Sequence, residues 1–126
     1  MRTTKAIEDY IPRLNQIIGF TNEPKWITIR FMINISLSFK KDKEFDTNVE
    51  FDGKTYNLEQ ITGEGKEQED YTDLYWNMFE AFEDIKIANK KDFVHKLEWH
   101  LVRGYRLLST SVKNNSNIYE FLTQEF

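Results

Sequence analysis

The stretch His100-Leu101-Val102-Arg103-Gly104 carries the most information about the fold, because it places a glycine inside a segment with helical periodicity. Residues 91–112 repeat apolar side chains at intervals of three and four, the spacing of an amphipathic helix. The apolar face consists of Phe93, Val94, Leu97, Leu101, Gly104, Tyr105 and Leu108. A glycine in a helix interior costs about 1 kcal/mol relative to alanine. Since Gly104 lies on the apolar face, we predict that another element packs against the backbone there.

The opposite face of this predicted helix is basic. It carries Lys96, Trp99, Arg103 and Arg106 at positions i, i+3, i+7 and i+10. In one interpretation the cations neutralise phosphates and the indole between them stacks on a base or a sugar. In the other, this is an exposed helix face whose arginines pair with the acidic residues of 71–84 in the same or another subunit. His100 lies at the edge between the two faces and is predicted to be a boundary histidine, hydrogen-bonded to a neighbour.

Residues 26–39 are compatible with two structures. Every odd position from Ile27 to Phe39 is apolar, and this alternation favours a strand. A helix is favoured by Thr21 and Asn22, which can cap it, and by Pro24, which suits a first turn. In that helix the polar residues form one stripe, made of Arg30, Asn34 and Ser38. The residues alone leave the choice open and slightly favour a strand.

Three further elements are predicted from helical spacing. Residues 5–18 form a helix that contains Pro12 and ends at Gly19, a good helix stop. Residues 71–87 form a second helix with an acidic, wet face. Its predicted core face consists of Tyr71, Leu74, Tyr75, Met78, Phe82 and Ile85. A short amphipathic tail over residues 118–126 follows a break at residues 114–117.

The middle of the chain contains two turn signals. Asp52-Gly53 lies between alternating residues, and this pair is the strongest short signal for a β-hairpin. We therefore predict a small β-hairpin near residues 49–58. Gly63-Glu64-Gly65 begins a stretch through Asp70 that is predicted to be a flexible acidic linker.

Length and composition indicate one globular domain over residues 1–126. The chain has no cysteine, which excludes disulfides and thiolate chemistry, and no apolar run of the ~18 residues that a membrane span needs. No secretory signal precedes the first polar residues, so a cytoplasmic location is expected. The net charge of −4 argues against a free-standing nucleic-acid binder, but residues 49–85 hold eleven of the acids and only two bases.

The residues that carry catalysis or bind metals in other proteins form no recognisable motif here. His95 and His100 are five residues apart, so they do not share a helix face as metal ligands at i and i+4 do. No nucleophile motif is present, and the carboxylates of 59–84 match no metal or acid–base spacing. We therefore expect a protein that is not an enzyme and has no cofactor; a carboxylate-based hydrolase would rest on the number of acids alone.

Four segments, taken in order, resemble the DNA sulfur modification protein DndE family. Each segment is short, and their order and spacing over about residues 15–110 make the set specific. The segments are Gly19-Phe20-Thr21 with Pro24, then Arg30-Phe31-Met32-Ile33-Asn34-Ile35-Ser36-Leu37, then Phe51-Asp52-Gly53 with Asn57 and Gly63-Glu64, and finally His100-Leu101-Val102-Arg103-Gly104. The family consists of small accessory subunits of the machinery that replaces a non-bridging phosphate oxygen of DNA with sulfur.

The resemblance implies a fold, partners and a surface. The family is mainly helical, so residues 24–39 are expected to be a helix, and the expected fold is a mainly α, compact helical bundle with the small hairpin. The family forms tetramers and works with a cysteine desulfurase, an ATPase and a sulfur-transfer enzyme. It is linked to nicked double-stranded DNA through surface lysines. The corresponding candidates here are Lys40, Lys41, Lys43, Lys96, Arg103 and Arg106.

The chain departs from the family pattern in ways that keep a second function open. Glu98 stands where the family has an arginine before the histidine, and Asn57-Leu58-Glu59-Gln60-Ile61 lacks the family's arginine. Affinity for DNA depends largely on the number of cations at the phosphates. The alternative is an acidic protein–protein interaction module of another defence system that has no direct contact with DNA.

Overall fold

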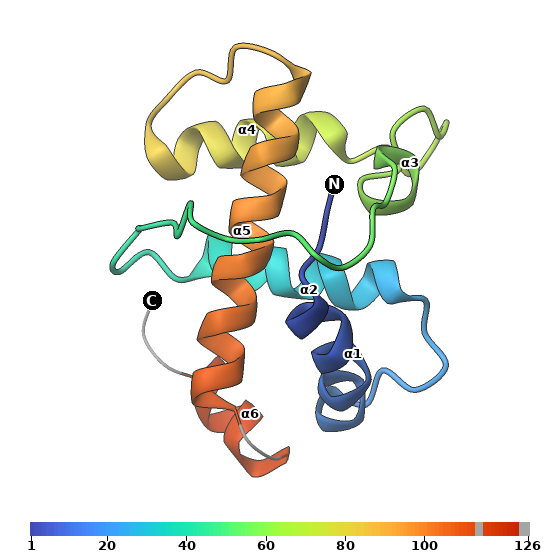
Figure 1. The fold of residues 1–126 in the computed structure, drawn as a ribbon, viewed down its shortest axis with the longest axis vertical. Helices are drawn as coiled ribbons and strands as arrows, with labels where there is room; N and C mark the ends of the chain where they lie inside the picture. The colour runs from blue at the N-terminus through green and yellow to red at the C-terminus, as the bar shows by residue number, and fades with distance from the viewer. Residues whose placement is uncertain (113–114, 124–126) are drawn as a thin grey trace.

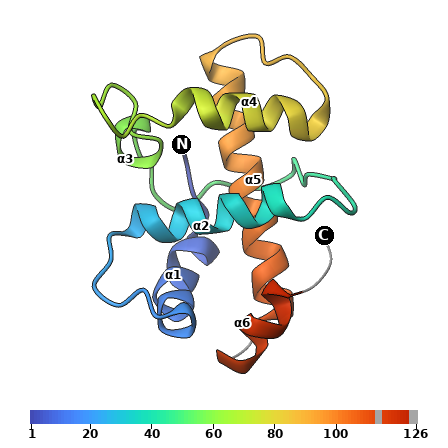
Figure 2. The ribbon, with the colours of Figure 1, turned by 180° about the vertical axis from the view of Figure 1, so that it is seen from behind.

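The computed structural model describes residues 1–112 and 115–123, and over these residues the chain is mainly helical, as expected (Figure 1). The helices are α1 (Lys5–Ile18), α2 (Lys25–Ser38), α3 (Leu58–Ile61), α4 (Thr72–Glu83), α5 (Lys90–Ser111) and α6 (Asn115–Leu122). The long α5 runs through the middle of the molecule, with α2 and α4 crossing it on one side (Figures 1 and 2). No helix among the described residues combines the length and the apolar character needed to cross a membrane.

The centre of the fold is the crossing of α2 and α5. A Cβ atom placed on Gly104 would lie 1.8 Å from the main-chain oxygen of Met32 and 2.6 Å from its carbonyl carbon. Only a residue without a side chain permits this approach, and the prediction that an element packs against the backbone at Gly104 is confirmed.

The ambiguous segment is helical, as the family resemblance implied. In its polar stripe, Asn34 and Ser38 are exposed and Arg30 is partly buried. Thr28, Ile29, Met32 and Ile33 are fully buried. The even positions of the apparent alternation thus include Met32 and Thr28, which lie in the core. The alternation of apolar residues wrongly favoured a strand. A helix that is buried on most sides has no wide polar face, so its sequence does not show the helical period of 3.6 residues.

The first helix forms as predicted. Thr4 caps α1 by accepting a hydrogen bond from the main-chain N–H of Ile7 at 3.0 Å, and the helix continues through Pro12. Gly19 ends it in a left-handed conformation with φ +79°. Ile7, Ile11 and Leu14 are then placed in the core.

The predicted β-hairpin near residues 49–58 is wrong. The segment is extended, and its backbone pairs with residues 1–3: Thr3 N–H donates to the Lys54 carbonyl at 2.8 Å, and Gly53 N–H donates to the Thr3 carbonyl at 2.9 Å. Neither Asp52 nor Gly53 has the positive φ that a type I′ hairpin turn requires. The Asp52 carboxylate instead accepts from the Lys5 N–H at the start of α1, at 2.8 Å.

The stretch predicted as a flexible linker is a closed loop. Tyr71 N–H donates to the Thr62 carbonyl at 2.8 Å, and Gly65 N–H donates to the Asp70 carboxylate at 3.0 Å. Gly63 has φ +79°, and a Cβ there would lie 1.9 Å from the carbonyl oxygen of Glu69. The glycine that indicated a linker is therefore required by the closure of the loop.

The orientation of α4 differs from the prediction. Its core side chains are Tyr75, Phe79 and Phe82, whereas four members of the predicted core face are exposed. Those four are Tyr71 at 42%, Leu74 at 54%, Met78 at 36% and Ile85 at 37% exposure. The helix also ends earlier than residue 87, because Asp84 adopts a left-handed conformation with φ 54°.

The C-terminal helix closes one end of the core. Ile118 and Phe121 are buried, and the Phe121 ring stacks on Phe39 with centroids 4.7 Å apart. Asn114, in the predicted break, and residues 124–126 of the predicted tail lie outside the described residues, and α6 already begins at Asn115.

Candidate nucleic-acid interface

Arg103 extends from α5 to the C-terminal end of α2. Its guanidinium donates to the carbonyl oxygens of Ser36 at 2.5 Å, Phe39 at 2.7 Å and Lys41 at 3.0 Å. The residue is 7% exposed, and burial lowers the pKa of the guanidinium while the charge of Asp42 opposes that effect. The last carbonyls of a helix have no partner within the helix. Arg103 therefore ends α2 and shapes the loop after it, with acceptors that are neither a phosphate nor an acidic side chain.

His100 lies in the core rather than at a boundary, although the predicted hydrogen bond to a neighbour is present. Its Nδ1 is 2.7 Å from the Ser36 hydroxyl, which also accepts a hydrogen bond from Arg103 at 3.1 Å. Because that hydroxyl accepts from the guanidinium, we assign its proton to the bond with Nδ1 and the imidazole proton to Nε2. Nε2 has no hydrogen-bond partner among the described residues.

Aromatic rings enclose this imidazole. The His100 ring stacks on Phe79 with centroids 4.5 Å apart and meets Phe45 and Phe82 edge-on at 4.8 Å and 4.9 Å. Burial, together with the charges of Arg103 and Lys96, lowers the pKa of His100 to about 3. At neutral pH the imidazole is therefore uncharged, and its hydrogen bond to Ser36 links α5 to α2.

The three lysines after α2 differ in their surroundings. Lys40 and Lys41 are exposed. Lys43 donates to the Phe82 carbonyl at the end of α4 at 2.9 Å, and its ammonium lies 4.8 Å from the centre of the Phe82 ring. Lys43 therefore helps to end α4, whereas the other two ammonium groups face solvent.

The remaining predicted cations are held in ion pairs. Lys96 pairs with Glu83 of α4 at 2.6 Å, whereas neither arginine of this face makes the pairing with residues 71–84 that the sequence suggested for them. Arg106 pairs with Asp46 at 2.6 Å and thereby lowers the pKa of that carboxyl group. Trp99 is half-buried, with Lys96 4.9 Å from its ring centre and Phe45 6.1 Å away.

The structure does not bring the six predicted cations to one surface. Lys41, Arg103 and Arg106 line a shallow cavity that also contains Asp42, Glu44 and Asp46. Lys40 and Lys43 line a different groove, between the end of α2 and α4. Lys96 lines a third hollow, next to Trp99 and His95. In the described part of the chain, no group of three or more His, Asp or Glu residues is placed to hold a metal ion.

The family model described as DNA sulphur modification protein DndE matches residues 1–116. The chain belongs to the DndE family. Membership of the DndE family implies involvement in DNA sulfur modification. The DndE match spans the α2–α5 crossing, the buried His100 and Arg103, and the lysine loop after α2. No curated protein and no solved structure gives a significant match to the chain.

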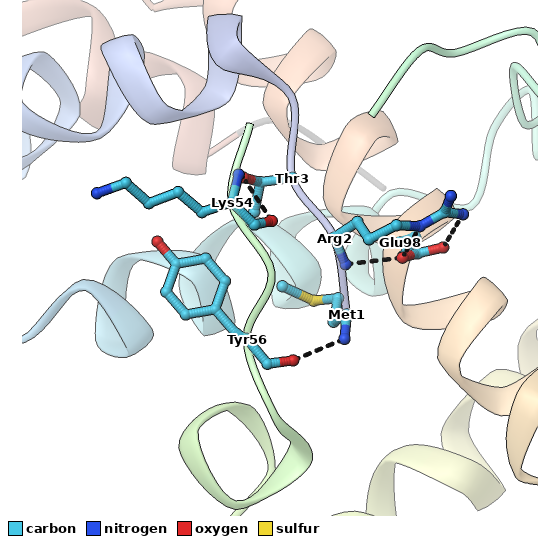
Figure 3. A network of polar contacts seen from close by, with 6 residues as sticks. All are labelled: Met1, Arg2, Thr3, Lys54, Tyr56 and Glu98. Carbon is cyan, nitrogen blue, oxygen red and sulfur yellow. Dashed lines mark hydrogen bonds and ion pairs between the residues drawn. The ribbon is translucent and has the colours of Figure 1, made fainter. Parts of the chain in front are cut away.

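An ion pair of this DndE-family chain, in which the acid is buried and the arginine side chain is half exposed, was not foreseen. Glu98, only 1% exposed, accepts from Arg2 through the main-chain N–H at 2.7 Å and through the guanidinium at 2.9 Å to each carboxylate oxygen (Figure 3). Beside it, the Met1 amine donates to the Tyr56 carbonyl at 2.7 Å. An acid among the buried residues of a helix indicates that a cation must pair with it. The sequence did not identify that cation, because Arg2 lies 96 residues away along the chain.

Proposed function

We propose that the chain is a non-enzymatic accessory subunit of a DNA phosphorothioation complex, which it helps to assemble or position on nicked double-stranded DNA. The observation that carries the proposal is the family match over residues 1–116. In the proposed complex, the chain acts as a homotetramer in the cytoplasm and contacts the sulfur-transfer enzyme and the ATPase subunit.

The use of the internal polar groups supports a non-catalytic role. Glu98 forms an ion pair with Arg2, and His100 is hydrogen-bonded to Ser36. The guanidinium of Arg103 donates hydrogen bonds to three carbonyl oxygens. A general base must be able to reach a proton of the substrate. A histidine enclosed by three phenylalanine rings has no such access, so these groups serve the fold.

Lys40 and Lys41 are the proposed phosphate contacts. Both are exposed, and Arg103 fixes the loop that carries them through the carbonyls of Phe39 and Lys41. A fixed loop loses less conformational entropy when it binds than a mobile one does. Because Arg103 is buried and Lys96 and Arg106 are paired, we leave these three residues out of the proposed contact surface.

The pathway is tested in a host that carries the modification. Deletion of the gene is expected to abolish phosphorothioate linkages, measured by digestion of genomic DNA and mass spectrometry, and re-expression is expected to restore them. Linkages that persist at the normal level in the deletion strain would overturn the proposal.

The DNA contact is tested with a nicked duplex in gel-shift titrations over a range of salt concentrations. Lys41→Ala should weaken binding and reduce the slope of log affinity against log salt by about 1. Lys66→Ala, which also removes one exposed lysine, is the matched control and should leave both unchanged. Lys41 is chosen because Lys40 also lines the groove beside α4.

The second candidate function is an acidic interaction module of another defence system without DNA contact. It is favoured by the net charge of −4 and by the pairing of Lys90, Lys96 and Arg106 with carboxylates of the chain itself. No shift of a nicked duplex at micromolar protein and low salt, together with normal linkages in the deletion strain, would favour this function.

A further inference from the structure

A cavity of about 260 Å³ lies between the first half of α5 and the connection that leads into it from α4. Figure 1 shows this connection arching from the end of α4 to the start of α5. One wall contains Ile85 and Ile87 of the connection, and the other contains Asp92, His95, Lys96 and Trp99 of α5. Pockets for drug-sized ligands have about 300–1,000 Å³. This smaller cavity therefore accommodates one planar ring system.

The wall formed by the connection is fixed by contacts within the chain. Ile87 N–H donates to the Glu80 carboxylate of α4 at 2.8 Å. The ion pair between Lys96 and Glu83, at 2.6 Å, joins the end of α4 to α5. Since these contacts already hold the two walls in place, little conformational entropy is lost when a ring binds between them.

The wall formed by α5 is aromatic. Trp99 is half-buried, and its ring lies 6.0 Å from that of His95, at an angle of 31°. Aromatic side chains in such positions stack with nucleobases, because every base has a π-face. Ile85 and Ile87 add apolar surface on the other side of the cavity. The shape and the lining thus suit a planar base.

The same wall carries one acceptor group and one donor group. Asp92, Lys96 and Trp99 stand at i, i+4 and i+7 and therefore share a face of α5. The Asp92 carboxylate has no hydrogen bond or ion pair within the described part of the chain. The Lys96 ammonium has three N–H donors, of which the pair with Glu83 needs only one. A matching ring must donate to a carboxylate and accept from an ammonium beside it.

Guanine has this arrangement on a single edge. Its N1–H and its exocyclic amino group both donate, which suits the two oxygens of a carboxylate, and its O6 on the same edge accepts. Adenine has no carbonyl oxygen, cytosine has a single donor group, and thymine has one N–H between two carbonyls. Proteins that hold an unstacked base read it through this edge.

We propose that the cavity binds the guanine ring of a nucleotide. The base lies against Trp99, its N1–H and amino group donate to Asp92, and its O6 accepts from Lys96. The ring comes from a free guanine nucleotide or from a base that is unstacked at a nick in DNA. The second source rests on the proposed function. It would give a chain of net charge −4 an affinity for DNA that depends little on the number of its cations.

The first experiment titrates the intact chain with GMP, IMP and AMP by calorimetry and ligand-observed NMR. The three ligands share the sugar and the phosphate; IMP lacks only the exocyclic amino group, and AMP lacks the carbonyl oxygen. GMP should bind about tenfold more tightly than either, because each of the others loses a hydrogen bond to a charged group. Equal affinities, or no saturable binding of GMP at millimolar concentration, would overturn the proposal.

Two variants separate the roles of the acceptor and the aromatic ring. Asp92→Asn should reduce the affinity for GMP to that for IMP. Asp73→Asn makes the same change in the first turn of α4, outside the cavity, and should leave GMP binding unchanged. Trp99→Leu should weaken GMP and IMP alike, by about fivefold to a hundredfold. Urea unfolding verifies that each variant is folded. A folded Asp92→Asn variant that still prefers GMP would contradict the assignment.

Nicked duplexes identify the source of the ring. Two duplexes are compared that differ only in an unpaired guanine or an unpaired adenine at the nick. A preference for guanine that Asp92→Asn removes would assign the cavity to DNA, and equal binding by a chain that prefers GMP would assign it to a free nucleotide. Normal linkages in the deletion strain together with GMP binding would overturn the proposed function alone. Lost linkages without any preference for GMP would overturn this inference alone.

Discussion

Gly104 of α5 lies directly against the main-chain carbonyl of Met32 of α2, so close that a single added carbon would come within 1.8 Å of the oxygen. The two helices therefore meet backbone to backbone at this point. The hydrogen-bonded groups at Ser36, His100 and Arg103 lie one turn along from that contact and join the same two helices. The crossing sets where the polar groups meet, and these groups in turn determine where α2 ends.

Substitution of Gly104 by alanine should push the two helices apart. Alanine gains about 1 kcal/mol of helix propensity over glycine. The overlap with Met32 involves backbone atoms, which cannot rotate away, so the net result should be a loss of about 1–3 kcal/mol of unfolding free energy. Urea denaturation measures this, with Thr110→Ala on the exposed side of α5 as a control that should change little. A stabilised Gly104→Ala variant would show that the crossing is looser than described.

Arg103→Lys should destabilise the fold even though the charge is kept. An ammonium on a shorter reach cannot donate to three carbonyl oxygens arranged around a planar guanidinium. Buried acceptors left without donors cost roughly 1–3 kcal/mol. Denaturant unfolding together with nicked-duplex binding separates the possible roles. If Arg103→Lys folds as stably as the wild type and loses only DNA affinity, then Arg103 contacts phosphate.

His100 should make the fold sensitive to acid well above the range where carboxylates protonate. In the unfolded chain a histidine binds a proton near pH 6.5, but burial lowers the pKa of His100 to about 3 in the folded chain. The unfolded state therefore takes up more protons as the pH falls through 6.5, and stability decreases until about pH 3. From pH 7.5 to 5.5 the loss should be about 1.4 kcal/mol, close to one full pKa unit.

This loss is measured by urea unfolding at pH 7.5 and pH 5.5. The lowered pKa values of Glu8, Asp46 and Asp70 affect stability only at more acidic pH, because their unfolded values lie near 4. His100→Gln should remove the His100 part of the pH dependence in this window and leave only the part from the Met1 amine, whose pKa burial lowers from its usual value near 8. His95→Gln should retain the full dependence. An unchanged pH dependence in His100→Gln would mean that another group titrates there.

Arg2 and Glu98 should show an energetic coupling larger than that of a surface pair. Arg2→Ala leaves the almost fully buried carboxylate of Glu98 with only the main-chain N–H of residue 2 as its donor. The expected loss of unfolding free energy is about 1–3 kcal/mol. A double-mutant cycle with Glu98→Gln should give a coupling of about 0.5–3 kcal/mol. The exposed pair Lys90–Glu64 is the control and should give less than about 1 kcal/mol. Equal coupling in both cycles would contradict this prediction.

Prediction from local patterns succeeded where the signal was local. The spans of α1 and α5, the helix stop at Gly19 and the close packing at Gly104 all follow from spacing and from glycine chemistry. The hairpin prediction was wrong because the pair Asp52-Gly53 indicates that a tight turn is possible. It does not indicate which segment of the chain pairs with residues 49–58. Here residues 1–3 supply the pairing partner, and the aspartate caps α1.

The candidate cations also show that local spacing predicts the helix but not the partners of its side chains. The spacing of Lys96, Arg103 and Arg106 correctly placed them on one helix, but nothing local indicated that α2 would end beneath Arg103 or that Glu83 and Asp46 would be within reach. Similarly, the apolar residues of α4 were assigned to one core face, and only their neighbours determine that Phe79 is buried while Leu74 is exposed.

The sequence by itself determined α1 and α5, the need for a glycine at the main crossing and membership of the DndE family, because periodicity, backbone freedom and motif order are properties of neighbouring residues. The tertiary structure alone decided that Arg103 ends α2, that His100 is enclosed and neutral, and that α4 presents an apolar stripe to solvent. The partners of His100 and Arg103 are about 60 residues distant along the chain. Which of two apolar faces is covered depends on how whole helices dock, and that is settled by the packing of the complete core.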